Sequence, residues 1–321
     1  MTRAGRRNVW PMLPEWLVSW CRTHLGAAPA DVLHESAHMS AVYGVRLTDG
    51  REVAVKARPD QSGRAATCVE VQRFAVLNGY PAAAPLTGVT LHAGQAVHAE
   101  QWRPGGDPLL GDDPATARLF AAPLARLVDL AADIDVGGRE PGAVEPPLPN
   151  PEWTRWDHDE PGVWPRIPYL DGHDESRVPG FVVEAGERLR DRLSGIYLPR
   201  VLGHADWESQ NIRWHGDTLW AVHDWDSLAW LPEAAIAGAA CGAFASHAEP
   251  TLAPIASSAA FLEAYQAARR PFTADEVEVA WAASLWLALH NARAEALRGS
   301  TPIALNAVAS QAIDRLRLAG A

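Results

Sequence analysis

Three features that mark other classes of protein are missing from this sequence. No apolar run approaches the ~20 residues that a membrane-spanning helix needs. The opening "MTRAGRRNVWPMLPEW" has basic residues without the apolar stretch of a secretory signal, so we expect no export signal. The cysteines Cys21, Cys68 and Cys241 lie far apart and match neither a zinc-binding spacing nor a disulfide framework, which favours a reducing cytoplasm.

Positive charge is also scarce. The chain has 28 Lys and Arg against 39 Asp and Glu, a formal net charge of -11. Nucleic-acid recognition needs a basic face, so we expect no nucleic-acid partner. The acidity is compatible with a cationic small molecule, although many cytosolic proteins are acidic for solubility alone. With 321 residues and 48% hydrophobic content, the chain can form one large or two coupled domains, as a monomer or homodimer.

The first hundred residues carry alternating helix and strand signals. An amphipathic helix is predicted over 13–26, with a proline at its start and a glycine at its end. Residues 41–58 contain two strand-like runs joined by Asp49-Gly50, a strong hairpin signal. A helix is predicted over 66–79, and two further strand-like runs over 88–102 are divided by Gly94.

Beyond residue 103 the pattern is mainly helical. Helices are predicted over 115–135, 180–193 and 276–297, and a small hairpin over 212–224. The Pro/Gly-rich stretch 137–153 is predicted to be a loop. The chain is therefore expected to be an α+β, two-lobed protein. Its small antiparallel-sheet lobe, with one key helix, would span 1–102, and its larger mainly helical lobe 103–321.

One short segment concentrates polar chemistry. In "GHADWESQNIRW", Asp206 and Asn211 are five residues apart, and Asp224 follows at the end of the predicted hairpin. A loop before one strand and a carboxylate after its hairpin partner bring such groups together. In phosphoryl transfer, one carboxylate orients the attacking hydroxyl, while an amide oxygen and a second carboxylate hold Mg²⁺. The spacing therefore favours a phosphotransferase.

A phosphotransferase of this type also needs a lysine for the nucleotide phosphates and a glutamate to hold it. Lys56 lies in the strand-like run "VAVKAR", and Glu70 lies in the helix that follows. Each residue alone is a weak signal. Their order upstream of Asp206, Asn211 and Asp224 is much less expected by chance.

Together these segments resemble the aminoglycoside phosphotransferase and choline kinase family, which has a protein-kinase-like fold. "HADWESQN" is similar to the family's H-G-D-x-x-x-x-N loop, and "HDWD" to its metal-binding Asp-Trp-Glu/Asp segment. "VEVQRFAVLNGYPAAAPL" is similar to the helix that holds the lysine partner, and "EQWRPG" to the hinge that ends in Pro-Gly. The resemblance spans about residues 30 to 245.

The resemblance implies a role for each matching residue in the catalytic segment. Asp206 would be the catalytic base, and Asn211 and Asp224 would bind Mg²⁺. His204 would brace the loop rather than react. ATP or GTP would be the co-substrate, and the acceptor would be a hydroxylated small molecule such as an aminoglycoside, an amino alcohol or a sugar.

The resemblance also assigns the nucleotide site. Lys56 would contact the phosphates with Glu70 as its ion-pair partner, and the turn 35–43, which includes Ser36, would cover them. The hinge at Glu100, Gln101 and Trp102 would hydrogen-bond adenine through its backbone.

Three departures from the family pattern stand out. Ala205 replaces the glycine after the loop histidine, and the phosphate-covering turn has no Gly-x-Gly-x-x-Gly. The family often has another aspartate after its Asp-Trp segment. Here the nearest carboxylate is Glu233, which leaves the subfamily open.

Several acidic residues near the motif carry less signal. Asp226 would either face the substrate or a second metal ion, or cap the segment that follows. Asp157 and Asp159, in the Trp-rich stretch 152–164, would either attract a cationic substrate or belong to a surface loop, which is the more common case. Glu208 is expected to be a solvated loop residue.

Other functions remain open from the sequence. His204, Asp206, His215, His223 and Asp224 could form the metal cluster of a phosphohydrolase. A non-catalytic nucleotide-binding module is a third reading. A protein kinase is disfavoured because the chain lacks the Gly-rich loop, Asp-Phe-Gly and Ala-Pro-Glu segments.

Overall fold

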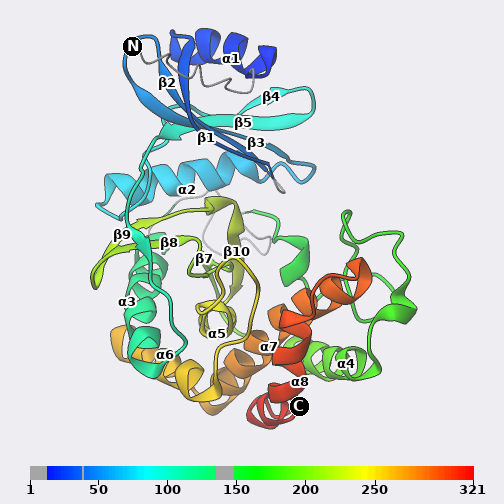
Figure 1. Ribbon diagram of the computed structural model, residues 1–321. Helices are drawn as coiled ribbons and strands as arrows, with labels where there is room; N and C mark the ends of the chain where they lie inside the picture. Colours follow the sequence, from blue (N-terminus) through cyan, green and yellow to red (C-terminus); the bar gives the residue numbers. More distant parts are fainter. Residues whose placement is uncertain (1–12, 38–39, 133, 135–147) are drawn as a thin grey trace, which may run out of the picture. The chain divides into compact units, whose positions relative to one another are not determined.

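The computed structural model describes residues 13–37, 40–132, 134 and 148–321 (Figure 1). The chain divides into two compact units. Unit 1 comprises Met1–Arg73 and Ala83–Pro104, and unit 2 comprises Phe74–Ala82 and Gly105–Ala321. Residues 38 and 39 of the expected covering turn 35–43, and most of the expected loop 137–153, lie outside the described residues.

Unit 1 is built on a five-stranded antiparallel sheet with the order β1-β2-β3-β5-β4. Its strands are β1 (Pro29–Ala37), β2 (Ala41–Leu47), β3 (Glu52–Pro59), β4 (Thr90–His92) and β5 (Gln95–Gln101). The predicted Asp49-Gly50 turn joins β2 to β3, and Gly50 has the positive φ of 89° that favours glycine there. Strand β1 was not predicted.

One face of this sheet packs against helix α1 (Glu15–Leu25), drawn in dark blue in Figure 1. Leu17, Trp20 and Cys21 of α1 share a buried apolar cluster with residues of β2, β3 and β5, among them Val45, Val55 and Val97. Because side chains alternate along a strand, the neighbouring residues, which include Lys56, point to the opposite face.

Helix α2 (Ala65–Leu77) runs across the boundary between the two units, since the division falls after Arg73. Two side chains near its end, Gln72 and Arg73, hold α2 against the rest of unit 1. The Gln72 amide nitrogen donates to Ala83 O at 2.7 Å, and Arg73 donates to Pro85 O and Thr87 O at 3.1 Å each.

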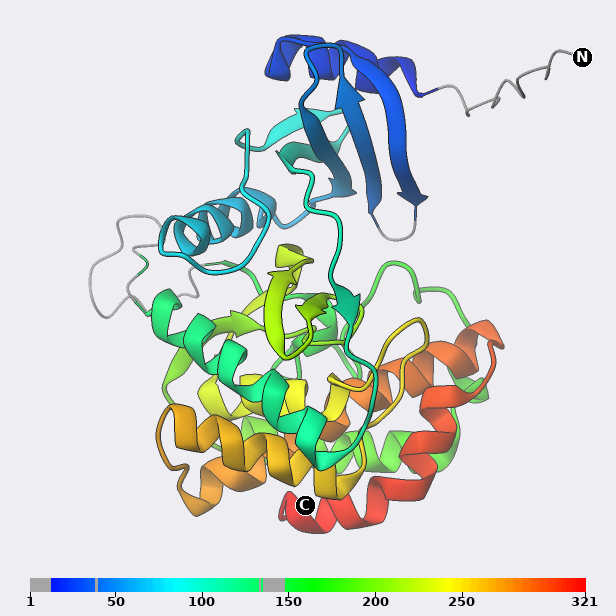
Figure 2. The ribbon, with the colours of Figure 1, turned by 60° about the vertical axis from the view of Figure 1, so that its left-hand side comes forward.

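Unit 2 is mainly helical, as predicted. Its helices are α3 (Pro114–Ala131), α4 (Gly180–Ser194), α5 (Glu233–Ala243), α6 (Ile255–Ala268), α7 (Ala274–Arg298) and α8 (Ile303–Leu318). Figure 2 shows these helices gathered around α5, with the short strands of the unit at one end. Glycines at 238 and 242 let α5 approach α7 closely, because a Cβ at Gly238 would lie 2.1 Å from Ala280 O.

Two small sheets complete unit 2. Strand β7 (Arg200–His204) pairs with β10 (Leu228–Pro232), and β8 (Ile212–His215) pairs with both β6 (Asp107–Pro108) and β9 (Thr218–Val222). The β8–β9 hairpin agrees with the prediction, whereas β6, β7 and β10 were not predicted. These sheets carry the loops that hold the polar motif.

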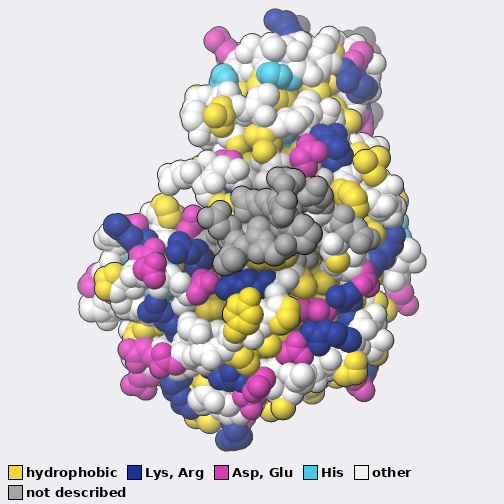
Figure 3. All heavy atoms as spheres, turned by 180° about the vertical axis from the view of Figure 1, so that it is seen from behind, with side chains coloured by type: hydrophobic (Ala, Val, Ile, Leu, Met, Phe, Trp, Pro, Cys, Tyr) yellow, Lys and Arg dark blue, Asp and Glu magenta, His cyan; other side chains and the backbone are white. Residues whose placement is uncertain are grey.

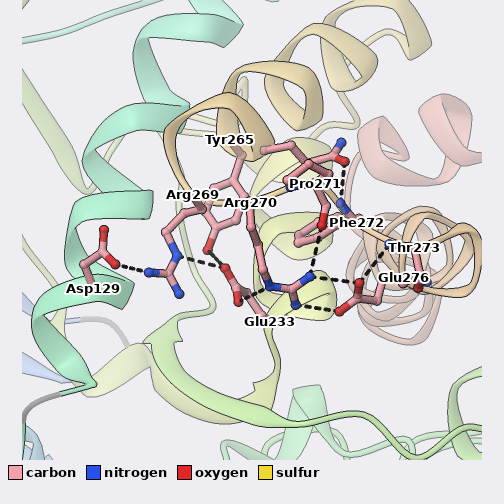
Figure 4. Close-up of polar contacts among 10 residues, drawn as sticks. Asp129, Glu233, Tyr265, Arg269, Arg270, Pro271, Phe272, Thr273 and Glu276 are labelled. Carbon is pink, nitrogen blue, oxygen red and sulfur yellow. Dashed lines mark hydrogen bonds and ion pairs between the residues drawn. The ribbon is translucent and has the colours of Figure 1, made fainter.

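A polar network joins four helices of unit 2 (Figure 4). Glu233 of α5 accepts hydrogen bonds from Arg269 Nε at 3.0 Å and Tyr265 OH at 3.1 Å. Arg269 also contacts Asp129 of α3, and Arg270 donates to both carboxylate oxygens of Glu276 on α7. Glu233 is therefore held by the packing of unit 2.

The surface of unit 2 has no single sign of charge over the face seen in Figure 3, where basic and acidic side chains are interspersed. In the part of the chain that the structure describes, no helix is long and apolar enough to cross a bilayer.

Candidate active site

The polar motif forms a loop between β7, which ends at His204, and β8, which begins at Ile212. The loop is held by hydrogen bonds to neighbouring segments and by one within the loop itself. Ala205 N–H donates to Ser227 O at 2.9 Å, and Asn211 N–H to Glu208 O at 2.9 Å. The fully buried Trp207 donates its indole N–H to Phe120 O at 3.0 Å. The side chains of the loop are thus presented from a fixed backbone.

Asp206 and Asn211 lie in direct contact. The Asn211 amide nitrogen donates to Asp206 Oδ2 at 2.9 Å and to Asp206 O at 3.0 Å. Because the nitrogen faces Asp206, the amide oxygen of Asn211 is the atom available to a cation. The contact also fixes one carboxylate oxygen of Asp206 and so orients the other.

Asp224 reaches the same place through the β8–β9 hairpin. His223 N–H donates to Asn211 O at 2.8 Å, so the residue after it lies beside the end of the loop. Asp224 has φ 55° and ψ 51°, a left-handed conformation that aspartate and asparagine tolerate better than most residues. One of its carboxylate oxygens accepts a hydrogen bond from Ser227 Oγ at 2.9 Å.

The electrostatics of this loop favour a bound cation. Burial raises the pKa of Asp206 to about 7, and the nearby negative charge of Asp224 adds to the rise, against the hydrogen bond from Asn211. A carboxylate and an amide oxygen are hard ligands of the kind that Mg²⁺ prefers. The donor set of Asn211 and Asp224 therefore fits a magnesium ion.

His204 uses both ring nitrogens within the protein. Its Nε2 donates to His223 O at 3.0 Å, and its Nδ1 accepts from Asp206 N–H at 3.3 Å. The residue is fully buried, and burial lowers its pKa, so the ring is neutral at pH 7. This geometry is what a loop-bracing residue requires, and it leaves no ring nitrogen for a metal ion.

Glu208 differs from the sequence expectation. It is buried with 7% exposure rather than solvated, and it accepts a hydrogen bond from the Gln210 side chain at 2.6 Å. Burial raises its pKa well above the usual range, and the charge of Asp206 adds to the rise. Asp226 lies in the short turn after Asp224, half-buried, and is close enough to His204 for its charge to act on that ring.

In unit 1, the expected partner of Lys56 is wrong. Lys56 Nζ lies 2.8 Å from Glu100 Oε1, whereas Glu70 is 63% exposed and pairs with Arg73 at 3.4 Å. The reason is strand register. Lys56 is opposite His98, and Glu100 is two residues further along β5, so both side chains lie on one face of the sheet.

Two backbone donors of the expected hinge are engaged within the protein. The backbone N–H groups of Gln101 and Trp102 donate within unit 1, to Ala84 O at 2.8 Å and Glu52 O at 3.2 Å. These two donors are therefore already used, and adenine cannot depend on them. The Trp102 ring instead lies against Gly44, where a Cβ would be 2.8 Å from the ring.

The remaining residue of the expected nucleotide site, Ser36, lies in β1. It is half-buried and is paired in register with Val42 of β2. This places it next to the segment 38–39, which lies outside the described residues.

The stretch 152–164 is anchored by its aromatic residues. Trp156 is buried and packs edge-on against Trp286 of α7, which donates its indole N–H to Trp153 O at 3.1 Å. Asp157 is paired with Arg200 at 3.1 Å, and Asp159 is exposed. These contacts match the surface-loop interpretation better than the cation-binding one.

Two residues, Glu100 in unit 1 and Glu208 in unit 2, were assigned other environments from the sequence. The carboxylate of Glu100 could have been assigned from the register of the predicted strands, because alternate residues share a face. The burial of Glu208 had no signal in the sequence, since nothing in "DWESQN" distinguishes a buried carboxylate from a solvated one.

Several solved structures are similar to this chain over nearly its whole length. No protein-family model and no curated protein matches it. Among solved structures, it is similar to amicoumacin kinase hAmiN in complex with AMP-PNP, Ca²⁺ and Ami, with TM-score 0.66 and 13% identity over 95% of this chain and 94% of that one.

Two aminoglycoside phosphotransferases are also similar. One, from Alicyclobacillus acidocaldarius, has TM-score 0.53 and 14% identity over 98% of this chain and 96% of its own. The other, a thermostable mutant of APH(4)-Ia with AMP-PNP and hygromycin B, has TM-score 0.56 and 13% identity over 95% and 98%. The chain therefore has the protein-kinase-like α+β fold that the aminoglycoside phosphotransferases and amicoumacin kinase share.

Proposed function

We propose that this protein is a phosphotransferase that moves the γ-phosphate of ATP or GTP to a hydroxyl group of a small molecule. The observation that carries the proposal is the loop of unit 2 in which Asn211 holds the Asp206 carboxylate and Asp224 lies beside Asn211. This arrangement supplies a base and two oxygen ligands from one rigid backbone. Phosphoryl transfer needs little more of the protein than such positioning.

Asp206 acts as the base in this proposal. Its free oxygen accepts a hydrogen bond from the acceptor hydroxyl, aims that oxygen at the phosphorus and takes the proton late in the transfer. Asn211 keeps the carboxylate in one orientation, and His204 holds the backbone of Asp206 in place.

Asn211 and Asp224 would hold Mg²⁺ with the nucleotide phosphates. When bound, the ion neutralises charge on the phosphate oxygens. Lys56, held by Glu100 in unit 1, would bind phosphate oxygens through its ammonium group. Ser36 would lie near the phosphates. Trp102, whose ring lies against Gly44, would border the nucleobase.

The acceptor is proposed to be a hydroxylated small molecule, with Asp226 the acidic residue best placed to meet it. The similar structures were solved with amicoumacin and hygromycin B, which supports antibiotics as the first acceptors to test. Asp157 is paired with Arg200, so its negative charge is already compensated and it is a weaker candidate for attracting a cationic acceptor. A reducing cytoplasmic location is also proposed, supported by three buried free thiols at Cys21, Cys68 and Cys241.

The proposal is tested by nucleotide consumption and product mass. Purified protein is incubated with Mg²⁺ and ATP or GTP against a panel of aminoglycosides, other hydroxylated antibiotics, amino alcohols and sugars. A product heavier by one phosphoryl group is expected with at least one class. The matched control is Asp206→Asn, which keeps shape but removes the charge, and should reduce kcat about 10²–10⁴-fold while nucleotide still binds.

A phosphohydrolase is the second candidate and gives a different result in the same assay. It would release phosphate without an acceptor, and a tightly held transition metal would be found by metal analysis. The contacts of His204 argue against it, because both ring nitrogens are engaged by backbone groups.

A further inference from the structure

Lys56 is chemically singular in this chain. Of the 28 basic Lys and Arg residues, 27 are arginines, and Lys56 is the only lysine. Wherever else the chain places a permanent positive charge, it uses a guanidinium group. Lysine differs from arginine as a compact point charge on a flexible stem. At position 56 the chain therefore has an ammonium group where it otherwise uses the planar guanidinium group of arginine.

Lys56 and Glu100 form a largely buried ion pair. The side chain of Lys56 is 14% exposed and that of Glu100 is 4% exposed. Burial acts to raise the pKa of Glu100, but the charge of Lys56 and the neighbouring His98 ring, whose Nε2 lies 3.8 Å from Glu100 Oε2, outweigh it, and the pKa lies well below the usual range. The glutamate is thus ionised under all ordinary conditions.

The second oxygen of Glu100 is held from helix α2. Gln72 Nε2 lies 2.9 Å from Glu100 Oε2 and 2.7 Å from Ala83 O. Gln72 is 2% exposed, whereas Glu70, two residues earlier on α2, faces solvent with Arg73. The helix therefore offers the sheet an amide, and the carboxylate that meets the lysine comes from strand β5.

We propose that Glu100 is the positioning residue for Lys56, and that Gln72 links the position of helix α2 to this ion pair through the Glu100 carboxylate. This rests on the proposed function, because it takes Lys56 as the residue that binds the nucleotide phosphates. Helix α2 then influences the position of Lys56 indirectly, through Gln72 and Glu100. A carboxylate placed at position 72 could take over the task that Glu100 performs.

The single lysine makes the ion pair directly observable. Protein grown with ε-¹³C-lysine gives one lysine ε-CH₂ signal, so its assignment is unambiguous. Four proteins are compared with wild type: Glu100→Gln, Glu70→Gln, the double variant Gln72→Glu/Glu100→Gln, and the surface control Glu52→Gln. The probes are AMP-PNP with Mg²⁺, titrated by NMR and calorimetry.

Glu100→Gln should move the Lys56 signal in the nucleotide-free protein and weaken AMP-PNP binding about 10–100-fold, the effect of losing a charge-assisted hydrogen bond of ~1.5–3 kcal/mol. Glu70→Gln and Glu52→Gln should change neither. The double variant should recover a large part of the lost affinity, which a general packing defect would not allow. In turnover, nucleotide KM should rise and kcat fall with Glu100→Gln, with acceptor KM unchanged.

Two results would overturn the proposal. One is a Lys56 signal that responds to Glu70→Gln and not to Glu100→Gln. The other is a double variant that binds AMP-PNP no better than Glu100→Gln alone. If wild-type protein binds no AMP-PNP, the proposed function fails and so does the phosphate-binding role of the pair. The lysine signal then still decides between Glu100 and Glu70 as the partner.

Discussion

Replacing Gly238 with alanine should destabilise unit 2, although alanine is the better helix former. The added Cβ would lie 2.1 Å from Ala280 O and 2.7 Å from Ala280 Cα, far inside the ~3.5 Å optimum for non-bonded atoms. Both atoms belong to the backbone of α7. No change of side-chain rotamer can relieve the contact, so α5 and α7 must move apart.

The magnitude follows from two opposing effects. Exchanging glycine for alanine within a helix is worth about 1 kcal/mol in favour of the variant. Overpacking a buried contact typically costs about 1–3 kcal/mol, and a backbone obstacle belongs at or above the upper end. The separation of the helices would also disturb Gly242, where a Cβ would be 2.5 Å from Ser284 O. We expect a net loss of about 2 kcal/mol, or a Tm lower by about 4–8 °C for a unit of this size.

Thermal unfolding followed by circular dichroism measures this loss, and Gly180→Ala is the matched control. Gly180 lies in the first turn of α4, and a Cβ there would meet no atom within 4 Å. The control should keep or raise Tm. A Gly238→Ala protein that melts at or above the wild-type temperature would show that the close approach of α5 to α7 is misjudged.

Two further changes test the metal site and the network of unit 2. Asp224→Asn keeps the size and the left-handed backbone but removes the charge of the proposed magnesium ligand. Mg²⁺-dependent turnover should therefore fall about 100-fold or more, because metal-ion charge stabilisation is worth several kcal/mol. Undiminished turnover at saturating Mg²⁺ would contradict the proposed role of Asp224. Glu276→Gln should lower Tm at pH 7 and lose this effect in acid. The hydrogen bond from Arg270 lowers the pKa of Glu276, although burial acts the other way. A lowered folded-state pKa gives stabilisation that is present above the unfolded value of ~4.3 and is lost as pH falls through the folded value. The Tm difference between wild type and variant should therefore shrink below about pH 4, and a constant difference down to pH 3 would refute the explanation.

Elements with strong local signals could be predicted from the sequence. The hairpin at Asp49-Gly50 depends on a turn that needs positive φ, and α7 depends on a long helical pattern after the capping residue Thr273. Strand β1 was missed because its exposed and half-buried residues follow no alternation. Strands β6, β7 and β10 are two to five residues long and pair with strands far away in the sequence, so no hairpin turn marks them as one marks β8 and β9.

For the candidate site, the spacing of Asp206, Asn211 and Asp224 was enough to suggest one loop and its hairpin. The sequence did not identify the partner of Lys56, because an ion pair across a sheet depends on strand register. That register is set by the pairing of β3 with β5. A glutamate on the following helix looks equally suitable in the sequence. The structure shows that Glu70 points away from the sheet, with 63% of its side chain exposed.

The left-handed backbone at Asp224 limits which substitutions this position can accept over evolution. The conformation admits glycine, asparagine and aspartate most readily. The proposed metal site favours a charged oxygen ligand at this position, which neither glycine nor the neutral amide of asparagine supplies. Aspartate is the one residue type that satisfies both requirements at little cost, so neither a glutamate with a longer reach nor a glycine with an easier backbone is an adequate replacement there.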